Sequence, residues 1–82
     1  HRLGGAPWEM YELARGLNEQ GYSVMAVKLA GHCGSLQELA GAGWMDWLAS
    51  VRRGADMLAC RTDRIVVGGI ATGAVLALAL AQ

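Results

Sequence analysis

The chain has 82 residues, 54% of them apolar, and its seven basic residues are balanced by seven acidic ones. Balanced charge argues against a surface for nucleic acid or anionic membrane, and two cysteines without a CxxC pair exclude a disulfide framework and suggest no zinc site. Because so short a chain buries only about 60–65% of its unfolded surface, the apolar content predicts surface that the chain does not cover itself.

The first half of the chain predicts a loop, a helix and a strand. Pro7 follows a glycine-containing loop and is well placed to open a helix. Residues 8–20 carry apolar side chains at helical spacing, and Gly21 supplies the stop that is usual after a helix. Residues 24–27 form a short apolar run, which predicts a buried strand.

The second half repeats this alternation. Ser35 and Glu38 have the spacing of an N-terminal capping box, which predicts a short helical turn. An apolar stripe at helical spacing continues over residues 44–60. Residues 65–67 are β-branched and predict a second buried strand, and residues 72–81 are apolar all round, which predicts an enclosed helix.

Strands that alternate with helices predict an α/β fold, with parallel strands and helices on both faces. Two strands alone do not complete such a sheet, so residues 1–82 are expected to form a single partial domain. The missing strands would then come from further sequence or from a partner chain, a second copy included. Residues 1–82 themselves contain no secretion signal, and a reducing, cytoplasmic setting is expected.

The strongest chemical signal lies in residues 65–74. A buried strand, a glycine-flanked turn and a buried helix are the setting of a nucleophile elbow, where Gly-x-Ser-x-Gly holds a serine in a strained turn. Here the pattern reads Gly69-Ile-Ala-Thr-Gly73. Gly69 and Gly73 supply the elbow glycines, but Ala71 has no lone pair to offer, so nucleophilic acyl transfer at this position is impossible.

Together with three other motifs, this stretch resembles the central part of an α/β-hydrolase. The branch it resembles is that of bacterial carboxylesterases and monoacylglycerol lipases, of the serine aminopeptidase S33 type. The opening His1-Arg-Leu-Gly-Gly5 matches the oxyanion loop, Ala30-Gly-His-Cys-Gly34 a glycine-rich histidine turn, and Trp44-Met-Asp-Trp47 the start of a helix. The resemblance covers nearly the whole chain, from the oxyanion loop to the helix after the elbow.

The resemblance implies a site. Its oxyanion hole would consist of the backbone amides of Leu3 and Thr72, and Ala71 stands where the family has its serine. The acid and histidine of the triad would lie beyond Gln82. Arg2 replaces a usual glycine, where its side chain would fill the acyl pocket or bind a carboxylate. A parent of this kind hydrolyses carboxylic esters or acylglycerols and uses no cofactor and no metal.

Three explanations of Ala71 remain open: an engineered change, a natural loss in a pseudo-enzyme, and one divergent copy among active relatives. As written, the chain is expected to be inactive, with a small-molecule ester or acyl group as its ligand. The alternative is a non-catalytic hydrolase-like protein that binds a small ligand or a partner chain. A membrane-associated reading of the uncharged residues 65–81 is disfavoured, because a span needs about 20 apolar residues and Gly68-Gly69 interrupts the run.

Several side chains near these motifs are expected to be structural. The Thr72 hydroxyl is expected to cap the helix that follows it, in preference to acting as a substitute nucleophile. His1 would hold the oxyanion loop, as the resemblance implies. His32 is expected to stabilise its turn beside a buried or half-buried Cys33, and the tryptophans at 44 and 47 to anchor the core.

Overall fold

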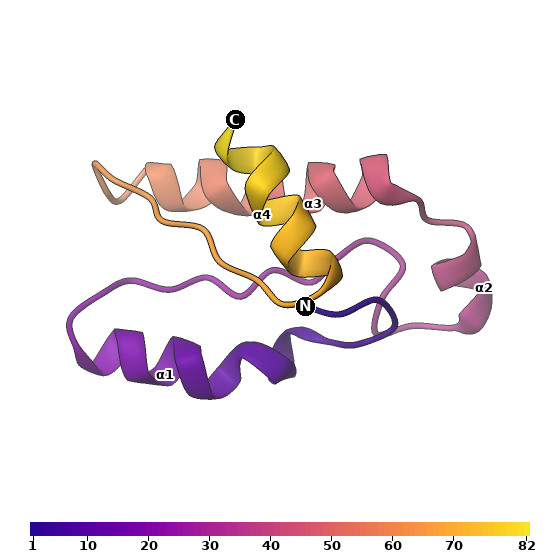
Figure 1. Cartoon of the computed structure of the whole chain (residues 1–82), viewed down its shortest axis with the longest axis horizontal. Coiled ribbons are helices and arrows are strands. Elements are labelled where there is room, and N and C mark those ends of the chain that lie inside the picture. The colour runs from indigo at the N-terminus through magenta and orange to yellow at the C-terminus, as the bar shows by residue number, and fades with distance from the viewer.

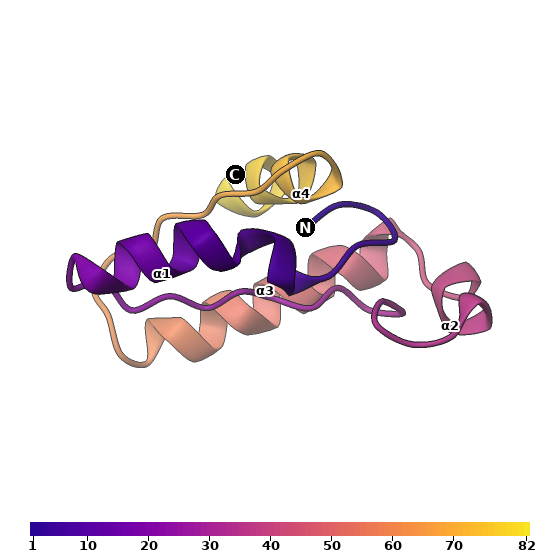
Figure 2. The same cartoon turned by 90° about the horizontal axis from the view of Figure 1, so that it is seen from below.

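The computed structural model describes every residue from His1 to Gln82, and all of its regular structure is helical (Figure 1). A short 3-10 helix, η1 (Pro7–Met10), leads directly into α1 (Tyr11–Glu19). They are followed by α2 (Leu36–Ala40), α3 (Trp44–Ala59) and α4 (Thr72–Ala81). Helix α4 packs on α3, and the extended segment after α1 lies between α1 and α3 (Figure 2).

The predicted parallel sheet is wrong, because the chain contains no β-strand. Residues 24–27 and 65–67 are extended, but no backbone hydrogen bond joins the two segments. A strand exists only where a neighbour supplies partners for its N–H and C=O groups. The predicted burial of these runs is wrong as well, because residues 24–26 and 65–66 are exposed. Apolar side chains alone carry no information about a neighbouring strand.

The predicted helix ends follow local signals and are confirmed. Pro7 occupies the first position of η1. The Ser35 hydroxyl accepts a hydrogen bond from the Glu38 amide at 3.1 Å, which caps α2. Gly21 follows α1 with a φ of +95°, a conformation that glycine adopts without a steric penalty. Helices α3 and α4 cover the residues expected of them, with α3 one residue shorter. The enclosure expected of α4 is wrong, because Val75 and Leu78 are exposed.

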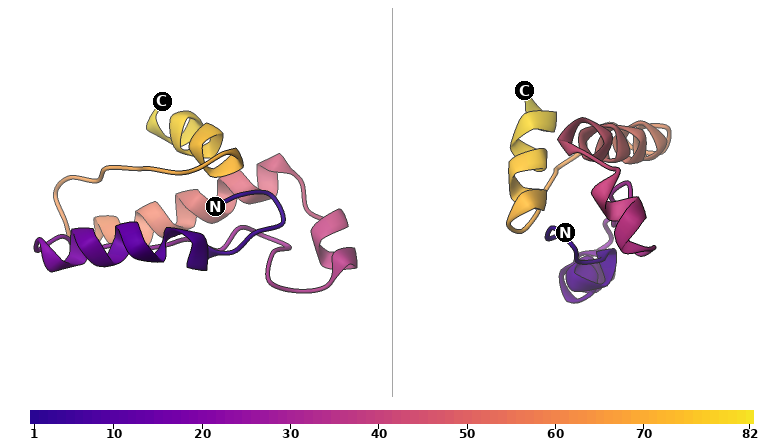
Figure 3. Two further views of the ribbon diagram at one scale, coloured as in Figure 1. Left: turned by 60° about the horizontal axis from the view of Figure 1, so that its bottom comes forward. Right: turned by 90° about the vertical axis from the view of Figure 1, so that its right-hand side faces the viewer.

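The buried core is small and partly polar. It consists of 7 of the 82 residues, and most of them lie where the N-terminus, the loop at residues 29–32, α3 and α4 meet. The buried residues are His1, Leu29, His32, Ser50, Gly54, Gly73 and Leu76. Figure 3 shows the N-terminus in the space bounded by α1, α3 and α4. Only two of the seven, Leu29 and Leu76, are hydrophobic side chains.

Much apolar surface is left uncovered, as the composition predicts. The accessible surface is 5979 Å², whereas a folded monomer of this mass exposes about 4,700 Å². Val66 is 95% exposed and Leu78 70% exposed, although both are large and hydrophobic. No helix is long and apolar enough to cross a membrane.

The isolated 82-residue chain is therefore expected to unfold without a cooperative transition. A cooperative domain absorbs about 0.7 kcal/mol per residue near 60 °C, and a core with two buried hydrophobic side chains does not support such a transition. Differential scanning calorimetry of the dilute chain should show a broad, shallow trace. A sharp peak whose van't Hoff and calorimetric enthalpies agree would contradict this expectation.

Candidate active site

A tight corner joins the extended segment at residues 64–69 to helix α4, and Ala71 lies at its tip. Ala71 has φ 51° and ψ −118° and is the residue immediately before the helix. Positive φ is rare for a residue with a Cβ and costs of order 1–3 kcal/mol, so the surrounding structure must hold it. The Ala71 side chain is exposed. The corner thus presents one strained, solvent-facing side chain at the start of a helix.

The two glycines that flank the corner are both required by packing. A Cβ on Gly69 would overlap the carbonyl group of Gly73, one helical turn further on. A Cβ on Gly73 would lie 2.7 Å from the backbone nitrogen of His1. Each glycine therefore allows one backbone to approach another, and the Gly-x-x-x-Gly spacing of the sequence reflects two separate close approaches.

Three successive backbone amides at the corner, those of Ile70, Ala71 and Thr72, have no partner within the chain. The Gly73 N–H donates to the His1 carbonyl at 3.1 Å and to the Ile70 carbonyl at 2.9 Å, and the next two amides donate to the carbonyl of Ala71. The Thr72 N–H makes no hydrogen bond within the chain. An unpaired amide at a helix N-terminus is a donor suited to a negatively charged oxygen.

In the loop at residues 1–5, one backbone amide makes no hydrogen bond within the chain. The Arg2 N–H donates to the Glu9 carboxylate at 3.0 Å, the Gly4 N–H to His32 Nε2 at 3.0 Å, and the Gly5 N–H to the Arg2 carbonyl at 3.0 Å. The Leu3 N–H has no partner in the chain. The bond between the His1 carbonyl and the Gly73 amide ties this loop to the start of α4, so the Leu3 and Thr72 amides belong to two segments that are in contact.

The Arg2 side chain binds a carboxylate, one of the two roles expected of it, and that carboxylate belongs to Glu9 of the same chain. The Arg2 side chain lies 3.6 Å from the Glu9 carboxylate as an ion pair and is 63% exposed. The Glu9 carboxylate thus contacts both the backbone amide and the side chain of Arg2, and a Cβ on Gly5 would collide with it. Sequence analysis missed Glu9, because a carboxylate on an exposed helix face looks like ordinary surface charge.

Both histidines are buried, and the neighbouring thiol is not. His32 Nδ1 lies 3.1 Å from the Ala30 carbonyl, which confirms its role in stabilising the turn. His1 is 6% exposed and bonds through Nδ1 to the Arg2 carbonyl, so it does hold the loop. The expected burial of Cys33 is wrong, because the residue is exposed, with a φ of +63°. No group of three or more His, Cys, Asp or Glu side chains could hold a metal ion.

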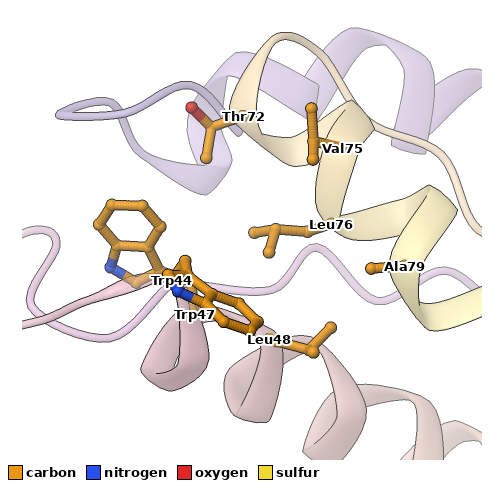
Figure 4. A pocket seen from close by; sticks show the side chains of 7 residues that line it. All are labelled: Trp44, Trp47, Leu48, Thr72, Val75, Leu76 and Ala79. Carbon is orange, nitrogen blue, oxygen red and sulfur yellow. The ribbon is translucent and has the colours of Figure 1, made fainter.

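The predicted helix cap at Thr72 is also wrong. The residue that caps α4 is Ala71, which has no side-chain acceptor, and the Thr72 hydroxyl makes no hydrogen bond within the chain. Instead the Thr72 side chain lines an apolar groove of about 410 Å³ between α3 and α4 (Figure 4). The groove residues are Trp44, Trp47, Leu48, Thr72, Val75, Leu76 and Ala79. A side chain in this groove is not the one at the tip of the corner.

The two tryptophans of this groove differ in burial. Trp44 is 63% exposed, so its predicted role as a core anchor is wrong for this chain. Trp47 is half-buried and packs edge-on against His32, with ring centres 5.8 Å apart. Its indole N–H is buried without a hydrogen-bond partner. The groove therefore offers apolar contact and little polar chemistry.

Comparison with known proteins relates the chain to a hydrolase. It is similar to a thermostable monoacylglycerol lipase from Bacillus sp. (strain H-257), with 34% identity over all 82 residues. The chain spans about a third of the length of that lipase, since the matched region is 33% of it. No family model and no solved structure matches the chain.

Proposed function

We propose that the corner at Ala71 and the loop at residues 1–5 form the carbonyl-binding part of a carboxylic-ester site. In this site the free amides of Leu3 and Thr72 donate to the carbonyl oxygen of an ester or acyl group. Ala71 occupies the position of the attacking serine, so the site binds its ligand without forming an acyl-enzyme. The whole protein to which these residues belong is thereby assigned to carboxylesterase-type hydrolases or their non-catalytic relatives.

The backbone of Ala71 is the observation that carries this proposal. An alanine gains nothing from a φ of 51° and a ψ of −118°, and strained backbone of this kind concentrates at functional sites. A strained residue at a sharp turn into a helix is also what a nucleophile elbow requires. The unpartnered amides of Leu3 and Thr72 suit an oxygen that gains negative charge, because preorganised donors stabilise such charge most effectively.

Similarity to the lipase supports the same class of ligand. Monoacylglycerol is the compound named for that protein, and its ester carbonyl is a group to which the Leu3 and Thr72 amides would donate. The absence of a hydroxyl at Ala71 favours a second function, in which the site only binds. A carboxylate carries the charge of the oxyanion permanently, so a free carboxylic acid is the ligand that such a binding site prefers.

Titration of the full-length protein with butyrate tests this proposal. Amide resonances in ¹H–¹⁵N spectra should move for Leu3 and Thr72, and the movement should saturate with concentration. Butyramide, which has the same shape without the charge, is the matched control and should produce smaller shifts. If neither amide responds to butyrate while other residues do, the carbonyl-binding assignment is wrong.

A further inference from the structure

We infer that His32 is a positioning residue for the Leu3 amide, acting through the peptide group of Gly4. This inference rests on the proposed function, in which the Leu3 amide is a donor to the ligand. His32 lies in a separate loop, 28 residues further along the chain than Gly4. It is 3% exposed, so its hydrogen bonds are shielded from competition by water.

The hydrogen bonds of His32 require one tautomer. Its Nε2 accepts from the Gly4 N–H at 3.0 Å and must therefore be unprotonated. Its Nδ1 lies 3.1 Å from the Ala30 carbonyl, which accepts only from a protonated nitrogen. Both bonds are satisfied at once by a neutral ring with the proton on Nδ1. In the other tautomer, the protonated Nε2 would face the Gly4 N–H, donor against donor, and the unprotonated Nδ1 would face the Ala30 carbonyl, acceptor against acceptor.

His1 makes an equivalent pair of bonds from the loop at residues 1–5 to the loop at residues 29–32. Its Nε2 accepts from the Leu29 N–H at 3.1 Å, and its Nδ1 lies 2.9 Å from the Arg2 carbonyl. The two rings meet edge-on, with centres 4.7 Å apart. Each loop thus contributes one histidine whose Nε2 accepts from a backbone amide of the other loop. Two hydrogen bonds therefore join the loop at residues 1–5 to the loop at residues 29–32.

Together these bonds orient the Leu3 N–H. In a planar trans peptide group the N–H points away from the preceding carbonyl. The Arg2 carbonyl is held by His1 Nδ1 and by the Gly5 amide, so the Leu3 N–H points away from both. The peptide group after Leu3 is held through the Gly4 N–H by His32. The peptide planes on both sides of Leu3 are therefore fixed, and one of them depends on His32.

The tautomer provides a test that does not depend on any activity. Long-range ¹H–¹⁵N spectra of the imidazole rings in the full-length protein should show His32 with its proton on Nδ1. A proton on Nε2 would overturn the inference, because that nitrogen would not accept from Gly4. This result would leave the butyrate titration unaffected, so failure of the inference and failure of the proposed function are separate outcomes.

Two substitutions test the bond itself. His32→Leu keeps an apolar side chain but removes the acceptor, and hydrogen exchange of the Gly4 amide should accelerate by about tenfold, in line with the net worth of one hydrogen bond. His32→Gln offers a carbonyl oxygen near the place of Nε2 and should restore most of the protection. Equal exchange of Gly4 in the wild type and in His32→Leu would contradict the inference.

A kinetic split distinguishes positioning from a purely structural role. In a background that carries Ala71→Ser, the His32→Leu change should lower kcat for p-nitrophenyl butyrate by at least about tenfold, because a misplaced oxyanion donor acts mainly on the transition state. KM should stay within about twofold, and His32→Gln should recover most of kcat. An unchanged kcat would overturn the inference, whereas absence of turnover in Ala71→Ser alone would count against the proposed function.

Discussion

Replacing Ala71 with serine in the full-length protein is expected to create esterase activity. The corner already presents the Cβ of residue 71 to solvent in a strained conformation, so the new hydroxyl would stand where an ester carbonyl meets the Leu3 and Thr72 amides. A single oxyanion donor is worth about 10²–10³ in kcat where it has been removed by mutation. Release of p-nitrophenol from a short-chain ester should rise at least about tenfold above that of the wild type.

The matched control for this experiment is Ala49→Ser. Ala49 is an exposed residue of α3, so the substitution adds the same hydroxyl at a place without free amides. It should leave the rate at the wild-type level. Equal rates for both serine variants, with both proteins folded, would show that the corner does not activate a bound ester.

Replacing Gly69 with alanine is expected to destabilise the full-length protein by about 3 kcal/mol, the upper part of the range for overpacking. The added Cβ would collide with the backbone of Gly73 and Ala74. Backbone in the first turn of α4 is not free to rotate away as a flexible side chain would. Urea unfolding should show a lower midpoint with an unchanged slope.

Gly16→Ala provides the opposite expectation from the same chemical change. Gly16 lies inside α1, and a Cβ built there would have no atom within 4 Å beyond its chain neighbours and the backbone of its own helix. Alanine in the middle of a helix is favoured over glycine by about 0.5–1 kcal/mol, so this variant should be slightly more stable than the wild type. If Gly69→Ala were as stable as Gly16→Ala, the close approach at the corner would not exist.

Local signals in the sequence predicted the helices well, because their ends depend on neighbours a few residues away. The Ser35 hydroxyl reaches the Glu38 amide within one turn. The two predicted strands were wrong because a strand depends on distant residues: residues 24–27 and 65–67 would have needed partners remote in sequence. Helix boundaries can thus be predicted from a few neighbouring residues, whereas sheet formation depends on segments far apart in the sequence.

The candidate site shows the same division. The corner at Ala71 follows from glycines two residues to either side, and the sequence carries that pattern in full. The contacts of Glu9 with the Arg2 amide and of His32 with the Gly4 amide follow from no local pattern. His32 bonds across 28 residues, and a histidine in a glycine-rich turn has the same appearance whether or not it has such a partner.

Acylation of a serine at position 71 tests the central claim most directly. The Ala71→Ser protein would be mixed with p-nitrophenyl butyrate, quenched in acid, digested and analysed by mass spectrometry. We expect a butyryl group on the peptide that contains residue 71, and none on the corresponding peptide of the wild type or of Ala49→Ser. A butyryl group found only on other side chains, or an unmodified residue 71 throughout the time course, would contradict the proposed ester site at this corner.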